Sequence, residues 1–279
     1  DNGEVFRLYE AWYQHEFSNM RVKLGLIDLN SEFDAIEPAG LFLNSSHGIG
    51  PDFSQTGENG PSIFPSTSPA LVVEYTGLEN WRITAGIFDA VPNDPENPKR
   101  HKLSLTEGAL LVGEINYIMP SEIRLAVGFY NYTSQFSPLL NPAETKVGNN
   151  GLYGILEAPL TKNITGWLRL GTANSHLNSL KNYIGGGLVF SGPLTARPDD
   201  QLGLAFGWAR AGDSFKQIIF DSGQQPANGE FNFELTYHYK ISDNISIQPD
   251  IQYVINPGSS HALKDALVIG IRFQIGHKF

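Results

Sequence analysis

Apolar and polar residues alternate along most of the chain, which is the pattern of β-strands with two different faces. The alternation is clearest in 245–253, where Ile, Pro and Tyr side chains oppose Ser, Gln and Asp side chains. The segments 231–239 and 267–275 repeat it. Ten further segments follow it less regularly: 5–16, 20–29, 70–77, 80–89, 108–118, 122–132, 151–159, 163–172, 183–192 and 201–210. The pattern predicts about thirteen strands of about ten residues each.

The connections between these segments alternate in length. Five are short turns: 17–19, 77–80, 119–121, 161–163 and 242–244. Five are long and rich in Pro, Gly, Asn and Ser: 31–68, 90–106, 134–149, 211–228 and 255–263. Short periplasmic turns and long extracellular loops are typical of outer-membrane barrels. We therefore predict an all-β fold, an antiparallel transmembrane β-barrel, with 1–279 as a single domain.

Aromatic residues stand at the ends of several predicted strands, on the apolar face. They are Tyr75, Trp81, Tyr117, Trp208 and Tyr253. Aromatic girdles at the two membrane interfaces would place them there, whereas the core edge of a soluble sandwich is the alternative. The chain ends in His277-Lys278-Phe279, and a C-terminal aromatic residue is frequent in outer-membrane barrels.

Thirteen is an odd number of strands, whereas bacterial single-chain barrels have an even number. An open sheet edge would leave backbone groups without partners in lipid. We therefore expect that the chain lacks the N-terminal strands of its barrel, most simply three. The alternative is a strand count that is wrong by one.

Composition excludes several classes of function. A formal net charge of −10 argues against nucleic-acid binding, and the lack of cysteine excludes disulfides and thiolate zinc sites. No apolar run is long enough for a transmembrane helix. The acidic stretches at 94–96 and 199–200 match no calcium loop, so we expect neither a metal nor a cofactor. The mean hydropathy of −0.20 is compatible with a barrel, because only every second residue of a barrel strand faces lipid.

With the polar face turned inward, acidic and basic residues alternate from strand to strand. The carboxylates lie on the predicted strands that run toward the short turns. They are Glu10, Glu74, Glu114, Glu157 and Glu234. The basic residues on the strands between them are Arg82, Arg124 and Arg169, and Arg272 lies beside Asp250 near the C-terminus. This pattern predicts cross-strand ion pairs in a polar, water-filled lumen. The pairs either neutralise the interior or offer hydrogen bonds to polyols.

Two indoles are expected among these charges, because Trp12 shares a face with Glu10 and Trp167 shares one with Arg169. An aromatic ring suits the apolar CH face of a sugar, while Arg and Glu suit its hydroxyl rim. The alternative is that inward aromatic side chains only narrow the lumen.

The connection 31–68 is unusually apolar for a loop, with Phe33, Phe42 and Phe53 among its large side chains. Folding it into the barrel would bury these groups and constrict the pore. The predicted constriction residues are His47, Asp52, Phe53, Glu58 and Asn59. The alternative is an external loop or a contact within a homo-oligomer.

Several stretches resemble the carbohydrate-selective porin family of Gram-negative outer membranes. They are RLYEAWYQ (7–14), VKLGLIDLNSEFD (22–34), AGLFLNSSHGIGPDFSQTGENGPSIFP (39–65), EGALLVGEINY (107–117), YIGGGLVFSG (183–192) and SIQPDIQYVINPG (246–258). The resemblance implies a sixteen-stranded barrel with an inward-folded loop, which admits glucose and other monosaccharides by passive diffusion. Family members carry further strands before the RLYE stretch, which agrees with the odd strand count.

Two other classes of function remain as alternatives. An outer-membrane barrel enzyme such as a lipase would need Ser, His and an orienting group together. The seven histidines fall mainly on predicted loops, and no GxSxG motif occurs. A soluble β-sandwich that binds a ligand would be purified without detergent. The expected partners of the channel are monosaccharides, outer-membrane lipid and lipopolysaccharide, and a homo-oligomer is possible.

Overall fold

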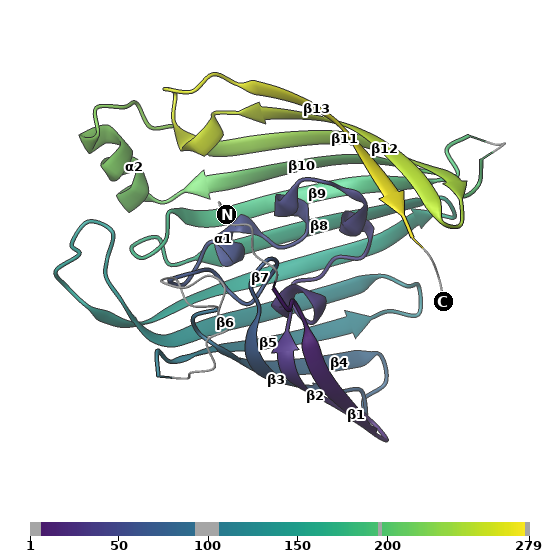
Figure 1. Cartoon of the computed structure of the whole chain (residues 1–279), viewed down its shortest axis with the longest axis horizontal. Coiled ribbons are helices and arrows are strands. Elements are labelled where there is room, and N and C mark those ends of the chain that lie inside the picture. The colour runs from purple at the N-terminus through teal and green to yellow at the C-terminus, as the bar shows by residue number, and fades with distance from the viewer. Residues whose placement is uncertain (1–6, 93–105, 195–196, 277–279) are drawn as a thin grey trace.

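The structure is a computed structural model that describes residues 7–92, 106–194 and 197–276. In this part of the chain, thirteen strands form one antiparallel sheet in which each strand pairs with its neighbours in sequence (Figure 1). In order they are β1 (Ala11–Phe17), β2 (Met20–Ile27), β3 (Ser68–Tyr75), β4 (Trp81–Asp89), β5 (Ala109–Ile118), β6 (Arg124–Phe136), β7 (Lys146–Thr161), β8 (Ile164–Ala173), β9 (Leu180–Ser191), β10 (Gln201–Ala211), β11 (Gly229–Ser242), β12 (Ile245–Ile255) and β13 (Ala266–Ile275). The predicted all-β fold is confirmed.

Three segments differ from the sequence pattern. The predicted loop 134–149 is shorter, 137–145, because β6 continues to Phe136 and β7 begins at Lys146. The strand expected at 5–16 begins only at Ala11, because Tyr9 and Glu10 bond to Asp28 at the start of the next long connection. The predicted loop 211–228 contains a helix, α2 (Asp213–Asp221), which period-two alternation could not reveal. Most of 90–106 and the C-terminal residues 277–279 lie outside the described residues.

The connections keep the predicted asymmetry. Short turns join β1 to β2, β3 to β4, β5 to β6, β7 to β8 and β11 to β12 at one end of the sheet. The connections 28–67, 212–228 and 256–265 lie at the other end. The connection 192–200 is longer than the other turns at its end. None of the helices in the described ranges is long and apolar enough to cross a membrane.

The outer face of the sheet is apolar along its whole width. Large aliphatic and aromatic side chains are exposed there, for example Val127, Phe233 and Ile269. Aromatic pairs lie at both ends of the strands: Trp81 contacts Tyr117 near the short turns, and Trp208 stacks on Phe231 near the long connections. Such a face is suited to lipid, with the aromatic rings at the two interfaces.

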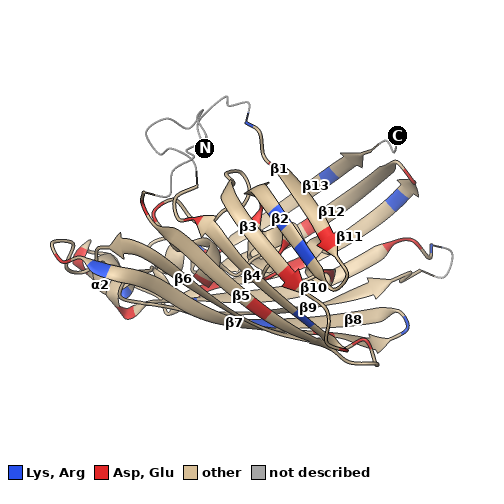
Figure 2. Cartoon of the chain, turned by 90° about the horizontal axis from the view of Figure 1, so that it is seen from below, with Lys and Arg blue, Asp and Glu red and all other residues tan. Residues whose placement is uncertain are grey.

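The sheet is strongly curved, so that its two edge strands, β1 and β13, lie toward the same side of the molecule (Figure 2). Within the described residues these two strands do not pair with each other. That further N-terminal strands complete a barrel of sixteen stays a prediction.

The connection 28–67, which we call the inner loop, packs against the concave face of the sheet (Figure 1). It contains the short helix α1 (Pro51–Ser54) and three single turns of 3₁₀ helix. Phe33 and Phe53 are fully buried between the loop and the strands. The ring of Phe53 stacks on Tyr130 of β6 at 3.9 Å between centroids. Burial of these rings against the wall explains why the loop is so apolar.

Candidate functional site

One arginine of the wall ties the inner loop to the barrel. Arg169 of β8 is 1% exposed, and its guanidinium binds two loop carboxylates at once. Its Nη2 lies 2.7 Å from Asp34 Oδ2, and its Nη1 lies 2.6 Å from Asp52 Oδ1. Burial raises the pKa of Asp34 to about 6, and the charge of Arg169 acts in the opposite direction. The buried cation and the two carboxylates thus depend on each other for solvation.

A second set of contacts holds the middle of the inner loop. The carboxylate of Glu234 on β11 accepts the backbone N–H groups of Leu43 at 2.6 Å and Asn44 at 3.0 Å. Gln248 of β12 donates from Nε2 to the carbonyl of Leu41 at 2.7 Å. These bonds satisfy loop backbone groups that burial removes from water.

His47 packs in the same region and has a perturbed pKa. Its ring contacts Trp167, with 5.6 Å between centroids, and its Nε2 lies 3.6 Å from Glu234 Oε2. Burial lowers the pKa of His47 to about 4, while Asn232 and Asp250 act in the opposite direction. The docked loop therefore favours the neutral imidazole.

We expect His47 to make loop docking sensitive to acid. In a released loop, His47 would have its ordinary pKa of 6.5 and would be protonated below that pH. In the docked loop, His47 stays neutral until about pH 4. The free energy that favours the docked loop over the released loop is therefore largest above pH 6.5. It falls as the pH drops toward 4, by up to about 3 kcal/mol. Limited proteolysis of the loop at pH 4.5 and 7.5 measures this in the wild type and in His47→Gln.

The variant keeps the groups that face His47, namely Glu234, Asp250 and Tyr183, so their own titration is common to both proteins. The raised pKa of Asp34, which favours docking at lower pH, is also common to both. An equal response to pH in the two proteins would show that His47 contributes nothing to it.

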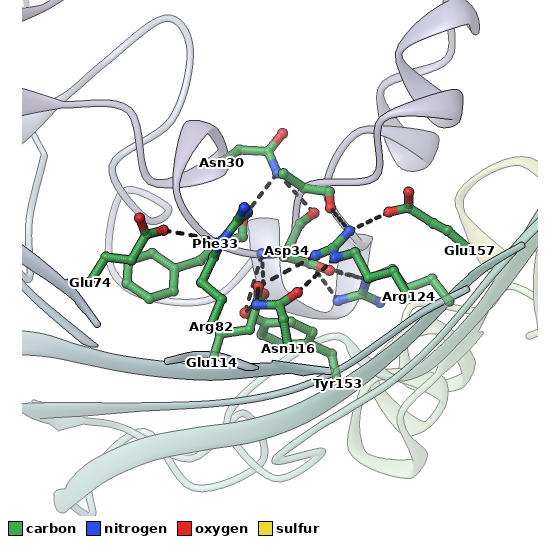
Figure 3. Close-up of polar contacts among 12 residues, drawn as sticks. Asn30, Phe33, Asp34, Glu74, Arg82, Glu114, Asn116, Arg124, Tyr153 and Glu157 are labelled. Carbon is green, nitrogen blue, oxygen red and sulfur yellow. Dashed lines mark hydrogen bonds and ion pairs between the residues drawn. The ribbon is translucent and has the colours of Figure 1, made fainter. Parts of the chain in front are cut away.

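An open, charged cavity of about 470 Å³ lies between the inner loop and strands β2 to β6. Three arginines of the wall line it, and carboxylates hold each of them. Figure 3 shows two of them, Arg82 and Arg124, with their carboxylates. The contacts are Arg21 with Glu32 at 2.8 Å and Glu74 at 3.2 Å, Arg82 with Glu74 at 3.6 Å, and Arg124 with Glu114 at 3.4 Å and with Glu157. Arg124 also donates to Asn116 and to the carbonyl of Ala35.

A second cavity of about 630 Å³ continues from the first beneath the loop, toward strands β7 to β13. The two share Glu37, Gly40 and Glu157 in their linings. The lining of the second cavity combines amide and hydroxyl side chains with three glutamates, Glu37, Glu122 and Glu157, and with His238 and Arg272. Together the two cavities form a polar region toward the short-turn end of the barrel.

The predicted charge pairs behave in two ways. Glu74 with Arg82, and Arg124 with Glu114 and Glu157, form the cross-strand pairs that we expected. Arg169 and Glu234 instead bind the inner loop, because the loop fills the space above them. Among the described residues no ion pair joins Asp250 to Arg272: Asp250 lies opposite Gly270, and Arg272 lies opposite Gln248. Glu10 precedes β1 and accepts from the backbone N–H of Asp28.

The two predicted indoles also differ from each other. Trp12 lies on the inner face of β1, is 47% exposed and carries Lys23 Nζ over its ring at 4.0 Å. Trp167 also points inward but is only 5% exposed, because Phe42 and His47 of the loop cover it. Only the first is open to a solute.

The predicted constriction residues differ in exposure. His47, Asp52 and Phe53 face the wall and are buried, so they hold the loop and do not border open space. Glu58 and Asn59 are exposed, and Asn59 donates to the carbonyl of Pro92 at 2.6 Å. A carboxylate in an apolar loop, such as that of Asp52, can form a buried ion pair or can line a pore. The sequence does not distinguish these two roles.

Sequence reasoning missed four charged residues that matter here: Arg21, Glu32, Asp34 and Glu37. The alternation in 20–29 could have revealed Arg21, because it places this residue on the same face as Lys23. Nothing local marks the three acidic residues, since they lie in irregular backbone. No group of three or more His, Asp or Glu side chains in the described ranges is placed to hold a metal ion.

An apolar exterior, a charged interior and an inward-folded loop define a membrane channel of the porin class. The comparison with known families agrees. The chain belongs to the carbohydrate-selective porin family, the OprB family, whose model matches residues 1–276. It is therefore an outer-membrane protein of Gram-negative type, and its homologues are transport channels.

Two curated relatives are similar over almost the whole chain. Porin B of Pseudomonas aeruginosa is 24% identical over 98% of this chain and 68% of its own length. The putative porin QuiX of Acinetobacter baylyi is 22% identical over 98% of this chain and 70% of its own length. The chain thus spans about two thirds of each.

Solved porin structures share the fold. The high-pH structure of Pseudomonas putida OprB superimposes with a TM-score of 0.83 at 20% identity, over 95% of this chain and 71% of its own. An anion-selective porin from Comamonas acidovorans gives a TM-score of 0.56 at 12% identity, over 96% of this chain and 74% of its own. At these identities the likeness concerns the fold alone.

Proposed function

We propose that this chain provides passive, carbohydrate-selective diffusion of monosaccharides such as glucose. The observation that carries the proposal is the cavity between the inner loop and β2 to β6, where three arginines and five glutamates offer hydrogen-bond donors and acceptors side by side. The inner loop, for which the sequence predicts the range 31–68, constricts the passage. Catalysis is not part of the proposed function, and hydrolysis of phospholipid by the purified protein would contradict this.

The charge pairs suit a neutral polyol for a physical reason. Guanidinium groups fixed by carboxylates present donors, and the remaining carboxylate lone pairs present acceptors, so a sugar hydroxyl finds both close together. An ion of either sign meets like charges in this lining, which has three arginines and five glutamates, and an anion meets more of them. Binding stays weak because each group already has a partner, and a weak site permits exit as well as entry.

Arg82 is the most available of the three arginines, because its side chain is 49% exposed and its ion pair with Glu74 is 3.6 Å long. We expect Arg82→Gln to lower the swelling rate of proteoliposomes in glucose about threefold, as one charge-assisted hydrogen bond is weakened. Glucuronate and glucosamine serve as charged solutes of similar size. Lys216→Gln, on the exposed helix α2, is the matched control.

Equal swelling rates for glucose and both charged solutes in the wild type would overturn the selectivity. Unchanged glucose flux in Arg82→Gln would show that glucose does not pass through this cavity. The lipid contacts of the outer face, binding of lipopolysaccharide and assembly into a homo-oligomer complete the proposal, and native mass spectrometry from detergent reports on the last two.

A further inference from the structure

A third cavity lies on the opposite side of the inner loop, toward the long connections. It has a volume of about 350 Å³ and shares no lining residue with the two cavities nearer the short turns. Its walls are β9, β10, β11, the loop segment around 44–55 and the side chain of Phe215 from α2. No residue of the edge strands β1 and β13 lines it, so its shape does not depend on what pairs with those edges.

The chemistry of this cavity differs from that of the arginine-lined passage. Amide and hydroxyl side chains dominate the lining, among them Asn44, Ser46, Gln55 and Asn232. Glu230 is the one charged residue of the lining, and no Arg or Lys contributes to it. Oε2 of Glu230 already accepts the backbone N–H of Gly258 at 2.7 Å, which leaves its remaining lone pairs for other donors.

The cavity also contains groups that a sugar would use. Gln55 and Asn232 bring amide groups to the lining, and an amide can both donate hydrogen bonds to sugar hydroxyls and accept them. Phe215 offers an aromatic surface to a CH face. The volume is at the lower end of the range for small-molecule sites, which suits one sugar ring with a few waters.

We propose that this cavity is an outer binding subsite for a neutral monosaccharide, distinct from the passage beneath the loop. Hydroxyl groups bind to the amides and to Glu230, and the apolar face of the ring packs on Phe215. A sugar acid is disfavoured here, because its carboxylate would approach Glu230 with no cation in the lining to compensate. The outer subsite therefore selects neutral sugars before any solute reaches the arginines.

The ligand class rests on the proposed function, but the experiment separates the two. Saturation-transfer NMR with methyl β-glucoside, on the purified full chain in detergent, measures equilibrium binding without passage. We expect Phe215→Ala, which removes the aromatic surface, to weaken binding about fivefold. Ala209→Phe should have at least the same effect, because Ala209 lines the cavity and a ring there would fill it.

Phe220→Ala is the matched control, since Phe220 belongs to the same helix, is exposed and lies outside the cavity lining. The anionic probe is methyl β-glucuronide, which should bind the wild type at least fivefold more weakly than the glucoside, and Glu230→Gln should reduce this difference.

Two results would overturn the outer subsite: binding unchanged by both Phe215→Ala and Ala209→Phe, or equal binding of glucoside and glucuronide by the wild type. Neither result touches the proposed function, which fails instead if proteoliposomes show no preference for glucose. Loss of binding in Arg82→Gln together with no loss in Phe215→Ala would place all sugar binding in the passage and would also overturn the subsite.

Discussion

Replacing Arg169 by methionine will release the inner loop from the barrel wall. The substitution leaves Asp34 and Asp52 buried with no cation beside them, and removal of one partner from a buried ion pair costs about 3–5 kcal/mol. The strands keep their backbone pairing, so the barrel remains folded. We expect a larger and noisier single-channel conductance and faster proteolysis within 31–68.

The control for this prediction is Lys216→Gln, which breaks an exposed ion pair with Asp213 that contributes little. A triple variant, Arg169→Met with Asp34→Asn and Asp52→Asn, removes the uncompensated charges and should recover much of the wild-type conductance. If Arg169→Met alone has wild-type conductance, the ion pairs of Arg169 with Asp34 and Asp52 do not hold the loop in place.

A single methyl group at Gly50 is expected to have a similar effect. A Cβ atom there would lie 1.8 Å from Nη1 of Arg169, and the guanidinium cannot move away without losing its carboxylates. Overpacking in a well-packed interior costs about 1–3 kcal/mol, and here the loss of ion-pair geometry adds to it. Gly50→Ala should therefore raise conductance and loop proteolysis almost as much as Arg169→Met.

Gly40→Ala is the matched control within the same loop, because a Cβ at Gly40 would meet no atom within 4 Å. Gly40 lines the passage, so the two variants are compared by proteolysis of the loop. The two variants differ from the wild type by the same methyl group in the same loop. If they behave alike, the effect of Gly50→Ala comes from backbone conformation and not from crowding of Arg169.

Alternation of side chains was sufficient to predict the fold. A strand in a barrel must place every second residue in lipid, so a segment such as 245–253 shows its two faces in the sequence itself. Helix α2 was missed because a helix of this length inside a loop leaves no period-two signal. The cross-strand pairs of Arg124 could be anticipated because antiparallel neighbours face each other at a fixed register.

The candidate site was only partly predictable from the sequence. The strands form one side of it, but the inner loop forms the other. The path of irregular backbone is determined by contacts far away in sequence, so nothing near Asp34 indicates that it meets Arg169. The apolar composition of 31–68 did predict that the loop is buried. It could not predict which of its polar residues face the wall and which, such as Glu37, remain open to the lumen.

The long sequence separations of the loop contacts bear on the order of assembly. Asp34 meets Arg169 across 135 residues, and Leu43 meets Glu234 across 191. Closing such long segments is entropically costly until the intervening strands have paired with their neighbours. The inner loop has no surface to dock on before β8 and β11 have joined the sheet. We therefore expect a nascent wide pore during biogenesis, which narrows only in the last step of folding.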